Sequence, residues 1–513
     1  MLAKVYSAST YGIDAYIVDV EVDMGYGLHS FVIVGLPDNA VKESQHRVTA
    51  AVKNSGFKLP VRRITVNLAP ADIKKEGAIF DLPIAIGMLS ALGVFRSNLL
   101  SKFLILGELS LDGTLRPIRG AISMAMAARD MNFSGIILPK ENGPEAALVK
   151  GANVYPMENL VEVIQFLSGT KTIEPLKSDF ENVFQSASEY SVDFSEVKGQ
   201  EHAKRALEVA AAGGHNILML GPPGTGKTML ARRLPTILPK MELEESLETT
   251  KIHSIAGILA TNQPIVATRP FRSPHHSISE AGLIGGGAYP KPGEVSLANN
   301  GVLFLDELPE FHRDVLESLR QPLEDGFVTI GRAKSTITYP SRFMLIASMN
   351  PCPCGFFSDP YKECTCTIHM IKKYRAKISG PLLDRIDVHI DVPSIKYESL
   401  AKKEPTESSE KIRERVNKAR EIQLERFKDI KKKKPIYCNS QMETKEIRKF
   451  CEIDTTSEGL LKNAIDRLGM SARAYDRILK VARTIADLEA SINIKPAHIS
   501  EAIQYRNFDR SLV

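Results

Sequence analysis

The sequence lacks tryptophan, and it has only six cysteines among its 513 residues. So few cysteines in a chain of this length exclude the framework of disulfide bonds that stabilises many small secreted proteins. No apolar stretch approaches the roughly 20 residues that a membrane-spanning helix needs. Residues 1–6 do not resemble the start of a signal peptide. We therefore expect a cytoplasmic protein with no membrane partner.

The chain also lacks a large net charge of either sign. Lysine and arginine number 66 against 61 acidic residues, which gives a formal net charge of +5. This excess permits binding to nucleic acid but is too small for a protein that coats DNA with its whole surface. Apolar residues make up 43% and charged residues 25% of the chain, as is typical of globular proteins. The length leaves room for about three domains.

Residues 221–228 form the clearest motif in the chain. In order, they are Gly221, Pro222, Pro223, Gly224, Thr225, Gly226, Lys227 and Thr228. The apolar run before them predicts a buried strand and the residues after them favour a helix, which is the context of a phosphate-binding loop. Its backbone N–H groups would face the phosphates, while Lys227 would reach the β- and γ-phosphates and Thr228 would hold Mg²⁺. The motif predicts ATP as the ligand.

Two further apolar runs end in polar residues. The run at 301–305 precedes two acids, and we expect Asp306 to provide a second Mg²⁺ contact and Glu307 to polarise the attacking water. The run at 343–349 ends at Asn350, which would hold that water against the γ-phosphate. These residues predict hydrolysis as well as binding of ATP.

The order of these strands is similar to that of AAA+ ATPases, and this resemblance assigns further residues. Val197 and Gly199 lie in a segment that resembles the adenine-contacting part of that superfamily. Residues 292–301 and 308–311 resemble the branch that contains magnesium chelatases and replicative MCM helicases.

Three more segments narrow the resemblance to the bacterial ComM/YifB family, and it covers essentially the whole chain. They are residues 269–276, 350–355 and 379–387. The resemblance implies a homo-hexameric ring ATPase that acts as a branch-migration helicase on branched or forked DNA, in recombination or natural transformation.

The resemblance assigns roles to two arginines. Arg385 matches the arginine finger, which would reach the γ-phosphate of a neighbouring subunit because its planar fork is permanently charged. The alternative is a surface arginine paired with Asp384 or Asp387. Arg473 matches the sensor-2 arginine at the start of a lid helix, and the alternative is a solvated helix residue.

We predict an α/β protein with an AAA+ P-loop core and a helical lid, preceded by an α+β domain. The predicted ranges are 1–170 for the first domain, 171–192 for a linker, 193–395 for the core and 396–513 for the lid. Within the first domain, an amphipathic helix is expected near 38–55 and a buried helix near 82–92. In the lid, helices are expected at 457–467 and 473–491.

Residues 107–113 and 117–120 give the first domain a resemblance to the Lon-protease-like fold, which is also called ribosomal S5 domain 2-like. A protease of that type needs a serine paired with a lysine. Ile79 and Met124 stand at those positions, and neither can act as nucleophile or base. We therefore expect a non-proteolytic interaction domain.

Four of the six cysteines lie in a loop at 351–369. They are Cys352, Cys354, Cys364 and Cys366. Four thiolates can close a tetrahedral structural Zn²⁺ site, and His369 could replace one of them. The spacing departs from the commoner Cys-x₂-Cys pairs, so four reduced thiols in a tight loop remain the alternative. Because the cluster begins two residues after Asn350, a metal would brace the loop that leaves the hydrolytic site.

Residues 328–339 predict a strand, a basic turn and a second strand. A hairpin at this place projects into the pore of MCM-like rings, so Arg332 and Lys334 would contact DNA phosphates, unless the hairpin is simply solvated. Lys291 lies in a glycine-rich segment that matches a second pore loop, the helix-2 insertion. We interpret His275 and His276 as loop or interface residues, because neighbours in an extended segment point to opposite faces.

Two other functions stay open at this stage. One is a chelatase-type motor that drives a partner enzyme inserting Mg²⁺ into a porphyrin. The other is a scaffold whose ATPase controls assembly. The Lon-like domain and the paired Cys-x-Cys motifs favour a DNA translocase, because they belong to the ComM/YifB resemblance.

Overall fold

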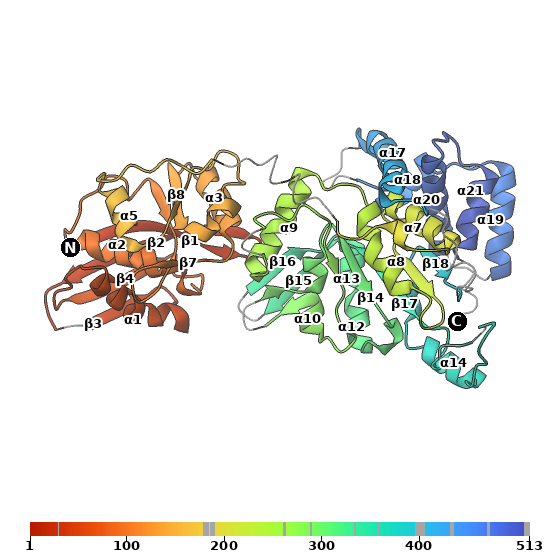
Figure 1. Ribbon diagram of the computed structural model, residues 1–513, viewed down its shortest axis with the longest axis horizontal. Helices are drawn as coiled ribbons and strands as arrows, with labels where there is room; N and C mark the ends of the chain where they lie inside the picture. The colour runs from red at the N-terminus through yellow and green to blue at the C-terminus, as the bar shows by residue number, and fades with distance from the viewer. Residues whose placement is uncertain are drawn as a thin grey trace. The chain divides into compact units, whose positions relative to one another are not determined.

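The computed structural model describes the chain except residues 29, 178–183, 185–189, 260–262, 288–289, 333–334, 358, 395–405, 431–435, 469–471 and 507–513 (Figure 1). It divides into two compact units. Unit 1 contains Met1–Ala187 and Ser246–Ala267, and unit 2 contains Ser188–Glu245 and Thr268–Val513. The predicted core, 193–395, therefore includes Ser246–Ala267, which the structure groups with unit 1. No helix in the described ranges has the length and apolar composition required to cross a bilayer.

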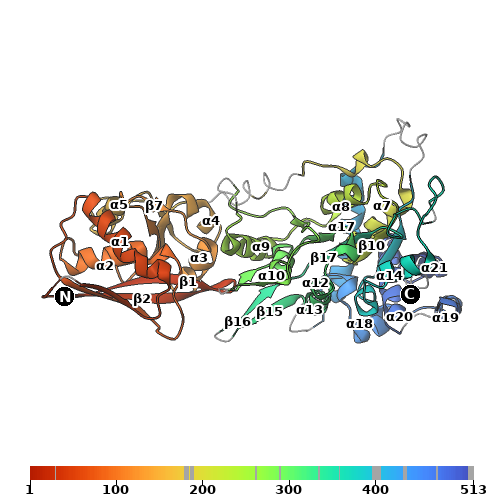
Figure 2. The ribbon, with the colours of Figure 1, turned by 90° about the horizontal axis from the view of Figure 1, so that it is seen from below.

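Unit 1 is built on a mixed seven-stranded sheet with the order β3-β4-β2-β1-β5-β8-β9. The strands are β1 (Leu2–Tyr11), β2 (Asp14–Gly25), β3 (Ser30–Val34), β4 (Arg63–Ala69), β5 (Phe103–Ile105), β8 (Gly135–Pro139) and β9 (Val154–Met157). Buried and partly exposed residues alternate along β4, as expected for a strand with one face in the core. The helices α1 (Asn39–Asn54), α2 (Asp81–Ala91) and α3 (Ala121–Asp130) cover one face of the sheet (Figure 2).

Both helices predicted in the first domain are present. The carboxylate of Asp38 accepts a hydrogen bond from the N–H of Val41 at 2.7 Å and so begins α1. Apolar residues run all round α2, and the helix is buried. Ile79 and Met124 are also buried, at 9% and 2% exposure, so the expected protease positions carry core side chains.

The segment of unit 1 that lies within the ATPase sequence contains most of α9 (Leu243–Ala256). The Ser254 hydroxyl donates to Oε1 of Glu145 at 2.6 Å and accepts the N–H of Gly120 at 2.9 Å. All three groups are buried, so these bonds hold α9 within unit 1. As a result, the chain passes between the units three times, at residues 187–188, 245–246 and 267–268.

The core of unit 2 is a five-stranded parallel sheet with the order β11-β14-β17-β10-β18. Its strands are β11 (Phe271–Arg272), β14 (Val302–Leu305), β17 (Met344–Met349), β10 (Ile217–Leu220) and β18 (Val388–Asp391). Every residue of β10, β14 and β17 is buried, which explains their uninterrupted apolar sequences. Since β17 lies between β10 and β14, the carboxyl ends of these three strands are neighbours, as the sequence predicted for an α/β P-loop core.

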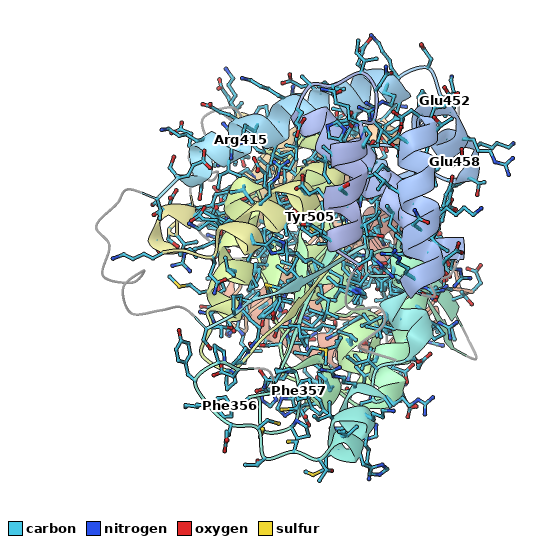
Figure 3. The ribbon with its side chains drawn as sticks, turned by 90° about the vertical axis from the view of Figure 1, so that its right-hand side faces the viewer. Phe356, Phe357, Arg415, Glu452, Glu458 and Tyr505 are labelled. Atoms are coloured by element: carbon cyan, nitrogen blue, oxygen red, sulfur yellow. The ribbon has the colours of Figure 1, made fainter. Side chains whose placement is uncertain are left out.

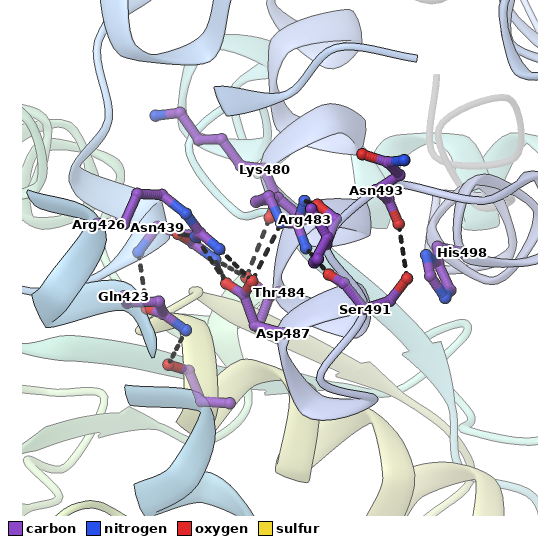
Figure 4. Close-up of polar contacts among 12 residues, drawn as sticks. Gln423, Arg426, Asn439, Lys480, Arg483, Thr484, Asp487, Ser491, Asn493 and His498 are labelled. Carbon is purple, nitrogen blue, oxygen red and sulfur yellow. Dashed lines mark hydrogen bonds and ion pairs between the residues drawn. The ribbon is translucent and has the colours of Figure 1, made fainter. Parts of the chain in front are cut away.

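The lid consists of helices after the core. They are α17 (Ser409–Phe427), α18 (Thr444–Phe450), α19 (Thr455–Leu468), α20 (Ala472–Leu488) and α21 (Pro496–Gln504), and α19 and α20 occur where two lid helices were predicted. The buried carboxylate of Asp487 accepts hydrogen bonds from Arg426, Arg483 and Asn439 (Figure 4). This network ties α17 and the segment before α18 to α20.

Candidate functional site

The phosphate-binding loop connects β10 to α8 (Lys227–Arg233), as predicted. Gly224 and Gly226 have φ angles of 79° and 89°, in the left-handed region that glycine adopts without strain. A Cβ atom added to either glycine would meet nothing within 4 Å. The loop therefore presents open space at the N-terminus of a helix, where a phosphate group fits.

The Lys227 ammonium is folded back onto this loop. Its Nζ donates to the carbonyls of Gly221 at 2.7 Å and Pro222 at 2.8 Å, and to Oδ1 of Asn350 at 3.2 Å. Burial of Lys227 lowers its pKa to about 8. The structure thus brings together two residues that the sequence assigned to the γ-phosphate.

A hydroxyl and a carboxylate meet beside the loop. Thr228 Oγ1 donates to Oδ2 of Asp306 at 2.7 Å, and the other carboxylate oxygen accepts from Ser348. Oxygen ligands of these two types suit Mg²⁺, so the predicted pair fits the ion. Ser348 was not among the predicted site residues, although it lies near the carboxyl end of β17, two residues before Asn350.

Glu307 has the left-handed backbone angle φ 53°, and its side chain is 55% exposed. Oε2 of Glu307 lies 3.8 Å from Nδ1 of His276. The expectation that His275 and His276 point to opposite faces is wrong, because their ring centroids are only 4.0 Å apart. The segment is not extended there: the N–H of Ile278 donates to the carbonyl of His275 and closes a turn.

The predicted adenine segment lies beside the loop. Val197 is buried and Gly199 has a φ of 63°. The next residue, Gln200, donates from its side chain to the carbonyl of Pro393 at 2.8 Å and to that of Thr225 at 3.5 Å. Its contact with Thr225 joins this segment to the phosphate-binding loop.

The two predicted arginines occupy different environments. Arg385 is only 6% exposed and pairs with Glu324, a partner that the sequence did not suggest. Asp387 pairs instead with Arg477 of α20, at 2.5 Å. Arg473 lies exposed at the start of α20. Among the described residues, neither Arg385 nor Arg473 makes a hydrogen bond or ion pair with the phosphate-binding loop of the same chain.

The four clustered cysteines come together, and their Sγ atoms all lie within 4.8 Å of one another. Cys352 lies 3.3 Å from Cys354 and 3.7 Å from Cys364, measured between Sγ atoms. Zn–S bonds of about 2.3 Å give a tetrahedron with edges of about 3.8 Å, so the spacing suits a metal ion. The cluster could therefore bind a metal.

The cysteine loop also touches the phosphate-binding loop. Gly355 has a φ of 88°, and a Cβ atom there would lie 2.7 Å from Cδ of Pro223. Phe356 and Phe357 of this loop lie at the end of unit 2 away from the lid residues Glu452 and Glu458 (Figure 3). The cysteine loop is thus placed to affect the nucleotide site rather than the lid.

The two predicted pore elements pack on each other. They are the hairpin of β15 (Phe327–Arg332) and β16 (Ser335–Pro340), and the short hairpin of β12 (Gly285–Gly286) and β13 (Lys291–Pro292). The Tyr339 hydroxyl donates to the carbonyl of Pro290 at 2.7 Å. A Cβ on Gly285 would lie 2.8 Å from Cδ1 of Ile330, so the absent side chain permits this contact.

Two of the three residues predicted to contact DNA lie in the described part of the chain. Lys291 is exposed and Arg332 ends β15. Lys334 lies outside the described residues.

Comparison with known families gives three matches along the chain. The family described as "Magnesium chelatase, subunit ChlI" matches residues 193–400. "Subunit ChlI of Mg-chelatase" matches residues 20–142, and "Magnesium chelatase, subunit ChlI C-terminal" matches residues 406–506. The matches thus include both units.

Individual relatives cover still more of the sequence. The chain is 46% identical to "Competence protein ComM" of Haemophilus influenzae, over 100% of this chain and 98% of the relative. It is 43% identical to the protein YifB of Escherichia coli, with the same coverage. "Magnesium-chelatase subunit ChlI" of Euglena gracilis is 24% identical and covers 46% of this chain and 72% of that protein.

Proposed function

Because the chain belongs to the ComM/YifB family of magnesium-chelatase-like AAA+ proteins, we propose that it is an ATP-dependent DNA translocase. It would form a homo-hexameric ring in the cytoplasm and drive branch migration of forked or branched DNA, in recombination or natural transformation. The observation that carries this proposal is the packing of the two predicted pore hairpins through Tyr339 and Pro290 in the unit that contains the ATP site. The full-length similarity to a competence protein supports the pathway.

Residues at the carboxyl ends of the parallel strands would carry out ATP hydrolysis. Lys227 would exchange its carbonyl partners for the β- and γ-phosphates, and Thr228 and Asp306 would hold Mg²⁺, which neutralises phosphate charge. Glu307 would take a proton from the attacking water, and Asn350 would orient that water. The half-exposed carboxylate of Glu307 is accessible for this step.

The ring would complete each site with arginines from a second subunit. Arg385 would stabilise negative charge at a neighbour's γ-phosphate, and Arg473 would act as the sensor-2 arginine. A mixture of Arg385→Ala and Glu307→Gln subunits tests this arrangement, because some mixed interfaces then carry both intact groups. Partial recovery of ATPase activity is expected. Activity no higher than that of either variant alone, in rings shown to be mixed, would contradict the assignment.

The pore hairpins would grip DNA through its phosphates, which are the same in every sequence. ATP hydrolysis should therefore be stimulated by forked DNA of any sequence, and DNA binding should weaken steeply with salt. Arg332→Ala with Lys334→Ala, or Lys291→Ala, should reduce this stimulation and leave DNA-free hydrolysis intact. Lys462→Ala is the matched control, because Lys462 is exposed on the lid helix α19, outside the hairpins.

A structural role for Zn²⁺ is part of the proposal. The ligands would be Cys352, Cys354, Cys364 and Cys366, whose Sγ positions suit a tetrahedral ion. The ion would fix the loop that contacts Pro223 and so stabilise the ATP site from outside.

A chelatase-type motor is the second candidate, and the three family matches favour it. Such a motor would drive a partner enzyme and would need no DNA. Wild-type protein whose ATPase activity responds to no DNA structure would favour this candidate over the translocase.

A further inference from the structure

The proposed arginine finger is held inside its own subunit. Nη1 of Arg385 donates to the carbonyl of Pro381 at 2.5 Å, and Nη2 pairs with the carboxylate of Glu324. The Arg385 side chain is 7% exposed. Within the described residues, its Nε has no hydrogen-bond partner. An arginine that serves a neighbour's phosphate must expose its fork, so this arrangement is a withdrawn state of the finger.

The partner of Arg385 stands at the base of a pore hairpin. Glu324 belongs to α13 (Arg320–Asp325), and Gly326, which caps this helix, stands immediately before β15. The carbonyl of Gly326 accepts the N–H of Ser341, which follows β16. Both strands of the hairpin therefore meet at Gly326, two residues after Glu324, so a displacement of the hairpin base would be transmitted to Glu324.

The pair itself is suited to reversible opening. The Glu324 side chain is 54% exposed, so water can replace Arg385 as its partner at little cost. Arg385 keeps its charge whether or not it is paired with Glu324. A buried guanidinium group without a carboxylate partner has an unfavourable free energy. Loss of Glu324 therefore favours a position of Arg385 in which its fork meets another anion.

We propose that Glu324 is a positioning residue that restrains Arg385 until the β15–β16 hairpin engages DNA. This inference rests on the proposed function, and it adds a route by which DNA at the hairpin controls hydrolysis in the neighbouring subunit. DNA phosphates bound by the β15–β16 hairpin displace its base, Glu324 moves with it, and Arg385 becomes available to the γ-phosphate. Without DNA, the pair keeps hydrolysis slow.

The test is the steady-state ATPase activity of the assembled ring without DNA. Glu324→Gln should raise kcat roughly two- to fivefold, the factor that corresponds to a half-exposed ion pair. The KM for ATP should not change, because the phosphate-binding loop is untouched. Glu324→Asp, which retains the charge on a shorter side chain, should give an intermediate kcat. Asp325→Asn is the matched control, since it removes a charge from the same helix and leaves the Arg385–Glu324 pair.

A second variant separates positioning from a general structural effect. The gain in kcat should vanish when Arg385→Ala is combined with Glu324→Gln, because the released group is then missing. A DNA-free kcat in Glu324→Gln that is unchanged or lower than wild type would overturn the inference. Absence of DNA stimulation in the wild type would instead refute the translocase function, while the DNA-free kcat would still decide whether Glu324 restrains Arg385.

Discussion

Lys227 Nζ lies 3.2 Å from Oδ1 of Asn350, and this hydrogen bond joins the phosphate-binding loop to the end of β17. The same ammonium donates to the carbonyls of Gly221 and Pro222. Under the proposed function, a bound γ-phosphate would compete for this ammonium, and ATP entry would break its contact with Asn350. The Asn350 carboxamide would then be free to orient water, which would link binding of ATP to assembly of the proposed hydrolytic site.

We expect Glu307→Gln to slow hydrolysis strongly while ATP binding remains. The amide retains the shape of the side chain but cannot accept the proton of water, so kcat should fall about 100-fold or more. Lys227→Ala should weaken ATP binding itself. Nucleotide affinity and turnover measured on both variants separate these effects, and full turnover in Glu307→Gln would exclude its role as the base.

The affinity for ATP should fall as the pH rises above about 8. Below its pKa of about 8, Lys227 is an ammonium ion that can pair with phosphate, and above that pH it loses the charge. Phosphate favours the protonated form, so the Kd should rise by up to about tenfold per pH unit above 8. Binding titrations at pH 7, 8 and 9 measure this. Lys227→Arg keeps its charge throughout and should give a flatter profile.

Gly355→Ala should weaken ATP binding although residue 355 contributes no ligand atom. The new Cβ would stand 2.7 Å from Cδ of Pro223, and the positive φ of 88° disfavours any side chain. Either the cysteine loop or the phosphate-binding loop must shift. Gly459→Ala is the control, because a Cβ there meets nothing within 4 Å. Equal affinities in Gly355→Ala and wild type would show that the two loops move independently.

Protein purified without chelator should contain about one Zn²⁺ per chain. Because thiolate ligands bind metal in competition with protons, acidification or a strong chelator should release it. Cys352→Ser with Cys354→Ser should lose the metal, whereas Cys438→Ala, outside the cluster, should keep it. Elemental analysis and thiol titration measure the content. Metal-free, fully active protein with four reactive thiols would refute the site.

Ser254→Ala should destabilise unit 1 by about 1–3 kcal/mol, because it leaves the buried Glu145 carboxylate without one of its donors. Ser7→Ala is the matched control. Within the described residues, the buried Ser7 hydroxyl has no hydrogen-bond partner, so its removal should cost nothing. Thermal unfolding of the full chain compares the two. A larger loss in Ser7→Ala would contradict this account of α9.

The nucleotide site could be predicted because its residues follow continuous apolar strands. Asp306 and Asn350 come directly after such strands and Glu307 follows Asp306, and parallel strands bring their carboxyl ends together. The Asp306–Thr228 pair follows from this topology alone.

Other contacts depend on tertiary packing, and no periodic pattern in the sequence indicates them. Glu324 meets Arg385 across 61 residues of sequence, and both are ordinary charged residues in their local context. The segment that contains His275 and His276 was interpreted as extended, but a turn there brings the two rings together. The packing of α9 in unit 1 could not be predicted from the sequence either, because the contact between Ser254 and Glu145 joins two single polar residues far apart in the chain.

The position of α9 changes how the chain can be cut. A protease that cleaves between residues 187 and 188 would nick the protein without releasing unit 1, because Ser246–Ala267 stays packed there while remaining covalently part of the ATPase fragment. A truncated chain that begins after residue 187 would expose the buried side of α9, which includes Thr249, Ile252 and Ser254. If such a fragment aggregates, the newly exposed side of α9 would be the cause. A variant that lacks unit 1 should therefore also have residues 246–267 replaced, for instance by a short polar linker.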